Sequence, residues 1–278
     1  MISGGITDTA LVDAESVGDG IQTPFRSFLS DFCENKIAVI SFVVVVVVIM
    51  IALFAPFISP TDPYDLAIVT VADKALSPGM TMLSGQVAYL GTDGSGRDLL
   101  SSIFYGLRIS LTVGIGSGVI ALAIGVVIGL SAAYFGGRTD ALIMRLVDMQ
   151  LSFPAILIAL VLLVTLGKGV DKTLIALIVV QWAYYARTVR ASALVERNKE
   201  YIESAQCLAL SKSRILFRHL LPNVVAPIIV VGTMQTAHAI ALEATLSFLG
   251  LGMEQTEPSL GSLIANGFDY IHSGRIRS

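Results

Sequence analysis

The feature that most constrains this chain is an uncharged apolar run from Ile37 to Ile58, which contains six consecutive valines from Val43 to Val48. The run is long enough to cross the roughly 30 Å hydrocarbon core of a bilayer. Because lipid offers the backbone no hydrogen-bonding partner, the run must be a helix despite its β-branched side chains. Pro56 and Pro60 are expected to end it. Only 14% of all residues are charged and the mean hydropathy is +0.78, which indicates an integral membrane protein.

Four more apolar stretches follow, so we predict an all-α membrane protein with five transmembrane helices. The later four cover 109–134, 146–166, 173–188 and 224–248. The fourth is expected to end at Trp182, Tyr184, Tyr185, Arg187 and Arg190, which are typical of a membrane interface. The predicted order of domains is a tail over 1–36, the first helix over 37–58, a loop over 59–107, a core over 108–248 with a polar hairpin at 196–222, and a final segment over 249–278.

Small residues recur along the second apolar stretch. They are spaced three or four apart over several turns, at Gly114, Gly118, Ala121, Gly125, Gly129 and Ala132. Such a stripe lets another helix approach closely in a membrane. The spacing therefore predicts a helix-packing face.

The distribution of Lys and Arg predicts the orientation. With a cytoplasmic N-terminus, 11 of these residues fall inside: Arg26, Lys36, Arg138, Arg145, Arg187, Arg190, Arg197, Lys199, Lys212, Arg214 and Arg218. The other seven fall outside: Lys74, Arg97, Arg108, Lys168, Lys172, Arg275 and Arg277. Because cytoplasmic segments carry the excess of positive charge, we predict a cytoplasmic tail and hairpin, and extracytoplasmic segments over 59–107 and 249–278.

The polar stretch from Tyr201 to Asn223 differs most from its apolar surroundings. Ile202, Ala205 and Ala209 are expected to share one face of a short helix, and Ser211 is a plausible N-cap for the next. A helical hairpin continuous with membrane helices could transmit motion from a cytoplasmic partner. A charged loop that only fixes topology explains the residues equally well.

The same stretch resembles the EAA loop of ABC-importer permeases. Glu203-Ser204-Ala205 stands for E-A-A, and Leu221-Pro222 stands for the closing Leu-Pro pair. The stretches GTDGSGRDLLSSIFYGLRISLTVG (91–114) and LSFLGLGMEQTEPSLGSLIANG (246–267) are similar to the peptide/nickel branch of that family, and most similar to the C-type permease subunit of dipeptide and oligopeptide importers. The alternative is a membrane channel or receptor subunit outside this family.

The resemblance implies a type I importer fold, a bacterial inner-membrane location and a heteromeric complex. It implies a second permease, two cytoplasmic ATP-binding subunits and an extracytoplasmic solute-binding protein, with membrane lipid around the chain and no nucleic acid. Dipeptides, oligopeptides, glutathione-like compounds, opine-type conjugates and nickel chelates all remain possible substrates. Two departures stand out: Ala209 occupies the family's glycine position, and the family's last transmembrane helix is expected to be missing.

The candidate functional residues form two sets. The resemblance implies that the ATPase-coupling set is Glu203, Ser204, Ala205, Leu208, Ala209, Ile215, Leu221 and Pro222. The translocation-pathway candidates share one helical face: Gly232, Thr236, Ala239 and Glu243. Glu243 could line the pathway or be a hydrogen-bonded packing residue, and the second interpretation is slightly favoured. Asp148 is expected to pair with Arg145, one turn away.

No enzymatic activity is expected from the chain itself. The sequence contains no GxxxxGK[ST], HExxH or GxSxG motif, and His219 and His238 lack partners at metal-binding spacing. We therefore expect no cofactor or metal in this chain. ATP and Mg²⁺ would be bound by the partner ATPase subunits.

Overall fold

The computed structural model describes residues 32–65, 69–254 and 256–272. Most of the predicted tail lies outside the described residues, as do Arg275 and Arg277 of the final segment. The chain divides into two compact units, one up to Met50 and one from Ile51 onward, and each is described by itself.

Helix α2 (Lys36–Ile58) confirms the helix predicted from the uncharged run. It begins in the first unit, where the Asn35 side chain accepts bonds from the backbone N–H groups of Ile37 (3.1 Å) and Ala38 (3.2 Å). Its valines are largely exposed, as expected of side chains that face lipid. Pro56 lies inside the last turn and does not end the helix.

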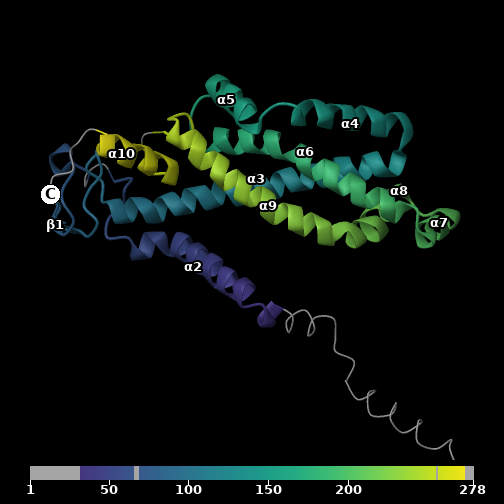
Figure 1. Ribbon diagram of the computed structural model, residues 1–278, viewed down its shortest axis with the longest axis horizontal. Helices are drawn as coiled ribbons and strands as arrows, with labels where there is room; N and C mark the ends of the chain where they lie inside the picture. The colour runs from purple at the N-terminus through teal and green to yellow at the C-terminus, as the bar shows by residue number, and fades with distance from the viewer. Residues whose placement is uncertain (1–31, 66–68, 255, 273–278) are drawn as a thin grey trace, which may run out of the picture. The chain divides into compact units, whose positions relative to one another are not determined.

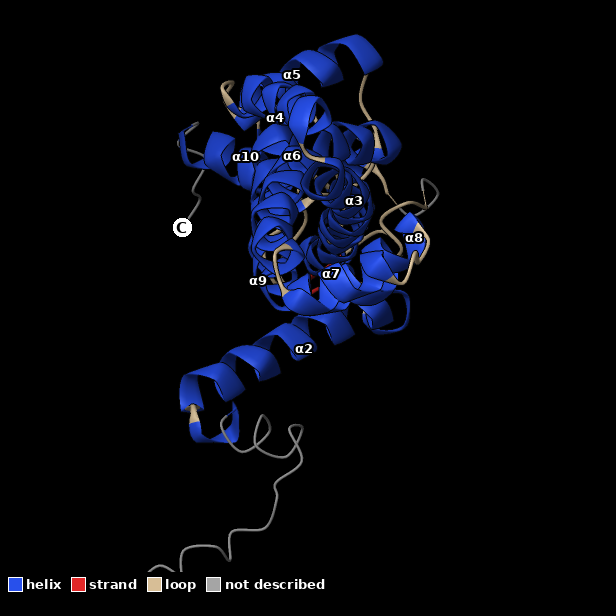
Figure 2. Ribbon diagram, turned by 90° about the vertical axis from the view of Figure 1, so that its right-hand side faces the viewer, coloured by secondary structure: helices blue, strands red, loops and turns tan. Residues whose placement is uncertain are grey.

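The second unit is built on three long helices that lie side by side (Figures 1 and 2). These are α3 (Leu99–Phe135), α6 (Val170–Arg197) and α9 (Leu221–Phe248). Among the described residues, α2, α3 and the continuous helix 212–248 are long and apolar enough to cross a membrane. The predicted all-helical membrane fold is confirmed.

The stripe of small residues on α3 packs as the spacing predicted. All six members are buried. An added Cβ at Gly114 would lie 2.4 Å from Ile240 Cγ1 of α9, and one at Gly125 would lie 2.4 Å from Tyr185 Cβ of α6. The first half of the stripe therefore contacts α9 and the second half contacts α6.

The third predicted span is not one straight helix. Helices α4 (Gly137–Leu151) and α5 (Ala155–Leu166) meet at an angle of 85°. Pro154 lies at the break, where it has no backbone N–H to donate to the preceding turn. The two helices are long and apolar enough to form a fourth membrane span only if they are counted together.

Helix α6 continues beyond the predicted end of the fourth span at Thr188 and stops at Arg197. Tyr185 is buried against α3, so it does not serve as an interfacial anchor. The arginines pair with α4: Arg190 makes a two-pronged ion pair with Asp140 (2.6 and 2.5 Å), and Arg187 pairs with Asp148. The predicted pairing of Asp148 with Arg145 is wrong.

The predicted loop over 59–107 ends earlier than expected, because α3 already begins at Leu99 with Asp98 as its N-cap. The loop contains a short 3₁₀ turn, η1 (Val71–Asp73), and a hairpin of β1 (Met80–Thr81) and β2 (Val87–Ala88). Within the final segment, 260–272 forms the amphipathic helix α10 (Leu260–His272). It packs on α9 where Gly261 meets the carbonyl oxygen of Ala244.

We predict that Gly125→Ala destabilises the protein, whereas Gly116→Ala is tolerated. The new Cβ at Gly125 would lie 2.9 Å from the backbone N of Ala186, whereas at Gly116 the nearest atom, Leu174 Cδ1, is 3.4 Å away. Overpacking of this kind costs about 1–3 kcal/mol. Thermal unfolding of the two purified variants should separate them, and equal midpoints would contradict the close α3–α6 contact.

Candidate functional site

The polar hairpin predicted over 196–222 is shorter in the structure, because α6 ends at Arg197 and α9 begins at Leu221. Residues 198–220, to which the name is applied from here on, join the two helices at one end of the bundle (Figure 2). It consists of α7 (Glu200–Cys207), a turn, α8 (Lys212–Arg214) and the π-helical segment η2 (Ile215–Leu220), which runs directly into α9. Ser211 is the N-cap of α8 as predicted, although its side chain makes no capping hydrogen bond. The β-hairpin and α10 lie at the opposite end of the bundle (Figure 1).

The inner face of the polar hairpin is part of the bundle core. Ile202, Ile215 and Leu220 are fully buried in one cluster with Leu130 of α3 and Val189 of α6. Burial of each large aliphatic side chain is worth about 1.5–3 kcal/mol. The polar hairpin is therefore fixed to three helices and cannot move without them.

The outer face carries the exposed members of the predicted coupling set. Glu203, Ser204 and Ala209 are exposed, and Leu208 is 74% exposed. Pro222, in the first turn of α9, is exposed as well. Ala205 and Ile215 are buried and Leu221 is half-buried, so these three support the hairpin from within. Ala209 was predicted to share the face of Ile202; that is wrong, because α7 ends at Cys207.

The turn after α7 is closed by a residue in the left-handed region. Ala209 has φ +54°; its N–H donates to the carbonyl of Gln206 (2.9 Å), and the N–H of Leu210 donates to that of Ala205 (3.3 Å). This pair of bonds is the Schellman arrangement, whose left-handed position is usually glycine. The two-helix geometry is kept with alanine, at a cost of about 1 kcal/mol.

A chain of hydrogen bonds links the polar hairpin to the helices on both sides. Asn223 of α9 donates to the Tyr201 hydroxyl (3.1 Å), which donates to Glu196 of α6 (2.6 Å). Lys199 pairs with the same carboxylate at 2.8 Å. Burial, followed by the bond to Glu196, raises the pKa of Tyr201 to about 12. The hydroxyl therefore stays protonated and keeps donating at neutral pH.

Proline accounts for an irregular start of α9. Pro222 is the second residue of α9 and has no N–H to donate to the carbonyl of Arg218, one turn back. The π-helical segment η2 ends at Leu220, two residues before Pro222. The Asn223 side chain donates to the carbonyl of His219 at 2.7 Å. Side-chain bonding of this kind stabilises the junction between the polar hairpin and α9.

The four pathway candidates do not share one environment. Glu243 is fully buried and accepts bonds from Ser110 of α3 (2.6 Å) and Ser247 (2.8 Å). Thr236 donates to the carbonyl of Gly232 (2.9 Å). Ala239 lines a cavity between α5, α6 and α9, and the other three are not among the residues that line it. The arrangement of Glu243 fits the packing interpretation, because both carboxylate oxygens have partners within the bundle.

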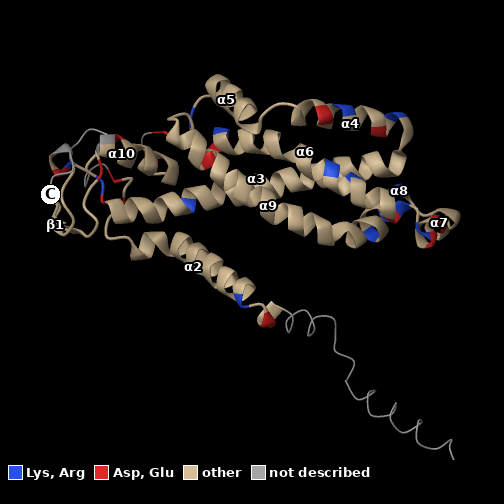
Figure 3. Cartoon of the chain, in the orientation of Figure 1, with Lys and Arg blue, Asp and Glu red and all other residues tan. Residues whose placement is uncertain are grey.

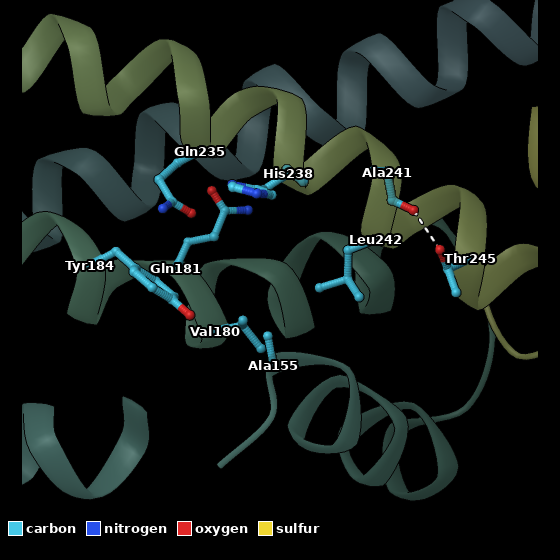
Figure 4. A pocket seen from close by; sticks show the side chains of 10 residues that line it. Ala155, Val180, Gln181, Tyr184, Gln235, His238, Ala241, Leu242 and Thr245 are labelled. Carbon is cyan, nitrogen blue, oxygen red and sulfur yellow. Dashed lines mark hydrogen bonds between the residues drawn. The ribbon is translucent and has the colours of Figure 1, made fainter. Parts of the chain in front are cut away.

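That cavity, of about 300 Å³, lies between α5, α6 and α9 (Figure 4). Its polar side chains include Gln181, Tyr184, Gln235 and His238; Tyr184 was predicted to be an interfacial residue and His238 was noted only as an isolated histidine, whereas Gln181 and Gln235 were missed. No motif marks the two glutamines. Each is a polar amide within a predicted apolar stretch or helix, and that is the signal that could have found them. Among the described residues, no group of three or more His, Cys, Asp or Glu could hold a metal ion.

Charged side chains concentrate away from this cavity. Figure 3 shows acidic and basic residues at the polar hairpin and along α4, while long stretches of α3 and α9 carry few of them. Lys212 lies over the ring of Phe135 at 5.5 Å, and Arg197 donates to the carbonyl of Ala133 at 2.7 Å. The first contact joins the polar hairpin to the last turn of α3, and the second joins the end of α6 to the same turn.

Comparison with known proteins gives consistent matches over most of the chain. Residues 125–272 match the family described as the binding-protein-dependent transport system inner membrane component. Residues 23–78 match the N-terminal transmembrane domain of oligopeptide transport permease C.

Individual relatives include three permeases. The di/tripeptide transport system permease protein DppC of Pseudomonas aeruginosa is 37% identical over 90% of this chain and 81% of its own length. The oligopeptide permease OppC of Bacillus subtilis is 34% identical over 92% and 81%. The glutathione transport system permease protein GsiD of Pectobacterium atrosepticum is 36% identical over 88% and 78%.

Among solved structures, an inward-facing MetNI methionine ABC transporter has a similar fold. The TM-score is 0.53, with 19% identity, over 64% of this chain and 83% of that one.

We predict that Ala209→Gly stabilises the polar hairpin by about 1 kcal/mol, because glycine adopts a positive φ without a Cβ clash. The matched control is Ala205→Gly, which should lose about 1 kcal/mol or more because Ala205 is helical and buried. Hydrogen exchange of the amides around 204–214 would measure both effects. Faster exchange in Ala209→Gly would contradict the left-handed turn.

We predict that Glu243→Gln assembles and supports uptake normally, because serine hydroxyls can accept from an amide as readily as they donate to a carboxylate. Glu243→Leu should lose about 1–3 kcal/mol, since Ser110 and Ser247 are left buried without this partner. Thermal unfolding and uptake assays test the pair. Normal stability but lost uptake in Glu243→Gln would instead establish a role for the charge.

Proposed function

Because this chain belongs to the binding-protein-dependent transport inner membrane component family, we propose that it is a permease subunit of an ATP-driven importer for peptides or related small solutes. The relatives named for dipeptide and oligopeptide transport support this substrate class. A channel or receptor subunit would leave the family match and the polar hairpin unexplained.

The observation that carries the proposal is the division of the polar hairpin into two faces. Its inner face is packed into α3, α6 and α9, while Glu203 and Leu208 point outward. A partner that binds the outer face therefore moves the bundle as a rigid body. In the proposed complex the partner is a cytoplasmic ATPase subunit, and its closure on ATP switches the bundle between inward- and outward-facing states.

The remaining parts of the complex follow from the same proposal. A second permease completes the translocation pathway, two ATPase subunits bind ATP and Mg²⁺, and an extracytoplasmic binding protein delivers the solute. In this proposal ATP hydrolysis belongs to the ATPase subunits and not to this chain. The N-terminus and the polar hairpin lie in the cytoplasm, which agrees with the excess of Lys and Arg on that side.

We predict that Leu208→Asp reduces recovery of the ATPase subunits with the permease and lowers ATP-driven uptake at least tenfold. An apolar anchor is replaced by a charge that must be desolvated at the interface. Leu208 is 74% exposed, so the fold should not suffer. Co-purification of the complex and uptake in proteoliposomes are the measurements.

The matched control is Leu83→Asp, because Leu83 is 72% exposed and lies in the loop before α3. It should leave co-purification unchanged. Ile215→Ala is a second comparison: its fully buried side chain predicts a loss of about 2–5 kcal/mol in stability rather than a specific loss of coupling. Full coupling in Leu208→Asp would contradict the proposed docking face.

A further inference from the structure

The cavity between α5, α6 and α9 has an apolar wall and a polar centre. Ala155 of α5 and Leu242 of α9 contribute to the wall. Figure 4 shows the side chain of Gln181 extending from α6 toward Gln235 and His238 of α9. A volume of about 300 Å³ is at the small end of the range for small-molecule sites.

Gln181 is the unusual member of this cavity. Gln181 is only 3% exposed, and its side-chain oxygen, Oε1, has no hydrogen-bond partner among the described residues. Its Nε2 donates to Ser117 Oγ at 3.4 Å, a long and weak bond. Such a buried, unpaired acceptor is rare in folded proteins and costs free energy.

The orientation of the Gln181 amide follows from its neighbour. The Ser117 hydroxyl already donates to the carbonyl of Gly114 (3.2 Å), so it can accept from Nε2 but has no second proton for Oε1. Exchanging the two amide atoms would leave Nε2 unpaired instead. In either orientation, one polar atom of Gln181 lacks a partner in the bundle.

The lining selects for uncharged hydrogen-bonding groups. The ten lining residues include no Asp, Glu, Lys or Arg. Gln181 offers an acceptor, and the 9% exposed Gln235 offers both a donor and an acceptor from the facing helix. A peptide group, with one N–H and one C=O, has the complementary pattern.

A second cavity of about 360 Å³ shares Tyr184 and Gln235 with the first. It extends along α6 and α9 past Thr188 and Val231. Since α9 begins at Leu221, next to the polar hairpin, the second cavity lies on the side of the first that is nearer that end of the bundle. The two cavities adjoin at Tyr184 and Gln235.

We propose that this cavity is a binding site for the backbone of a peptide in transit, and that Gln181 Oε1 accepts a hydrogen bond from a peptide N–H there. The inference rests on the proposed peptide-importer function and deepens it, since it places part of the solute recognition in the permease. Gln235 contacts the same peptide group from α9. Binding supplies the partner that the Gln181 amide lacks.

The test uses the complete importer, with both permeases and both ATPase subunits, in lipid nanodiscs without the binding protein. Equilibrium binding of radiolabelled trialanine is measured for wild type, Gln181→Leu and Gln181→Met. Loss of one hydrogen bond predicts an affinity about tenfold weaker in both variants. Two apolar replacements of different shape guard against a folding failure, which size-exclusion chromatography would detect.

The matched control is Ser117→Ala. It removes the weak bond to Gln181 and leaves the cavity lining intact, so trialanine affinity should stay within about twofold of wild type. A purely structural role for Gln181 predicts the reverse pattern: Ser117→Ala and both Gln181 variants would unfold at lower temperature, with unchanged affinity. That result would overturn the inference.

Uptake in proteoliposomes with the binding protein separates this inference from the proposed function. Trialanine uptake by wild type, together with fewer peptides imported per ATP in Gln181→Leu, supports both. Normal uptake by wild type but no trialanine binding, or equal behaviour of Gln181→Leu, overturns the peptide site alone. No uptake of trialanine or other short peptides by the complete wild-type importer overturns the proposed peptide-importer function.

Discussion

The packing of α3 against its neighbours is the constraint on which the rest of the second unit depends. In a bilayer the hydrophobic effect does not drive helices together, so their association relies on close van der Waals contact. Gly125 and Gly129 bring α3 against the backbone of α6, and Gly114 brings it against Ile240 of α9. With α6 and α9 fixed to one helix, their relative position is fixed as well. The cavity between them and the polar hairpin that joins them both follow from this arrangement.

The polar hairpin is held rigid by several modest interactions and not by one strong contact. The buried face formed by Ile202, Ile215 and Leu220 resists separation from the bundle. The Tyr201 hydroxyl links Asn223 of α9 to Glu196 of α6, so bending at either junction breaks a hydrogen bond. Ala209 holds a left-handed turn although it has a Cβ. That strain is tolerated because the two backbone bonds of the turn and the burial of Ala205 favour the same geometry.

The sequence predicted those parts of the fold that depend on composition and local spacing. The helix over 36–58 follows from an uncharged run, and the packing face of α3 follows from small residues at a regular spacing. The break at 152–154 and the length of α6 were missed. Arg187 and Arg190 are typical of the end of a span, but α6 continues past them and both side chains form ion pairs with α4. Such pairs form between residues about 40 to 50 positions apart, so no local pattern reveals them.

The same limit explains why the candidate site was only partly found. Glu243 attracted attention as a carboxylate in an apolar helix, yet two serines satisfy it within the bundle. Gln181 carries no charge and sits in a similar helix, but its carbonyl oxygen is left without a partner beside a cavity. A buried polar group with all its bonds made stabilises one packing arrangement, whereas one with a bond unmade has free energy to gain from a ligand. Function is therefore better indicated by the unsatisfied amide than by the satisfied charge, and only the three-dimensional arrangement of α3, α6 and α9 tells the two apart.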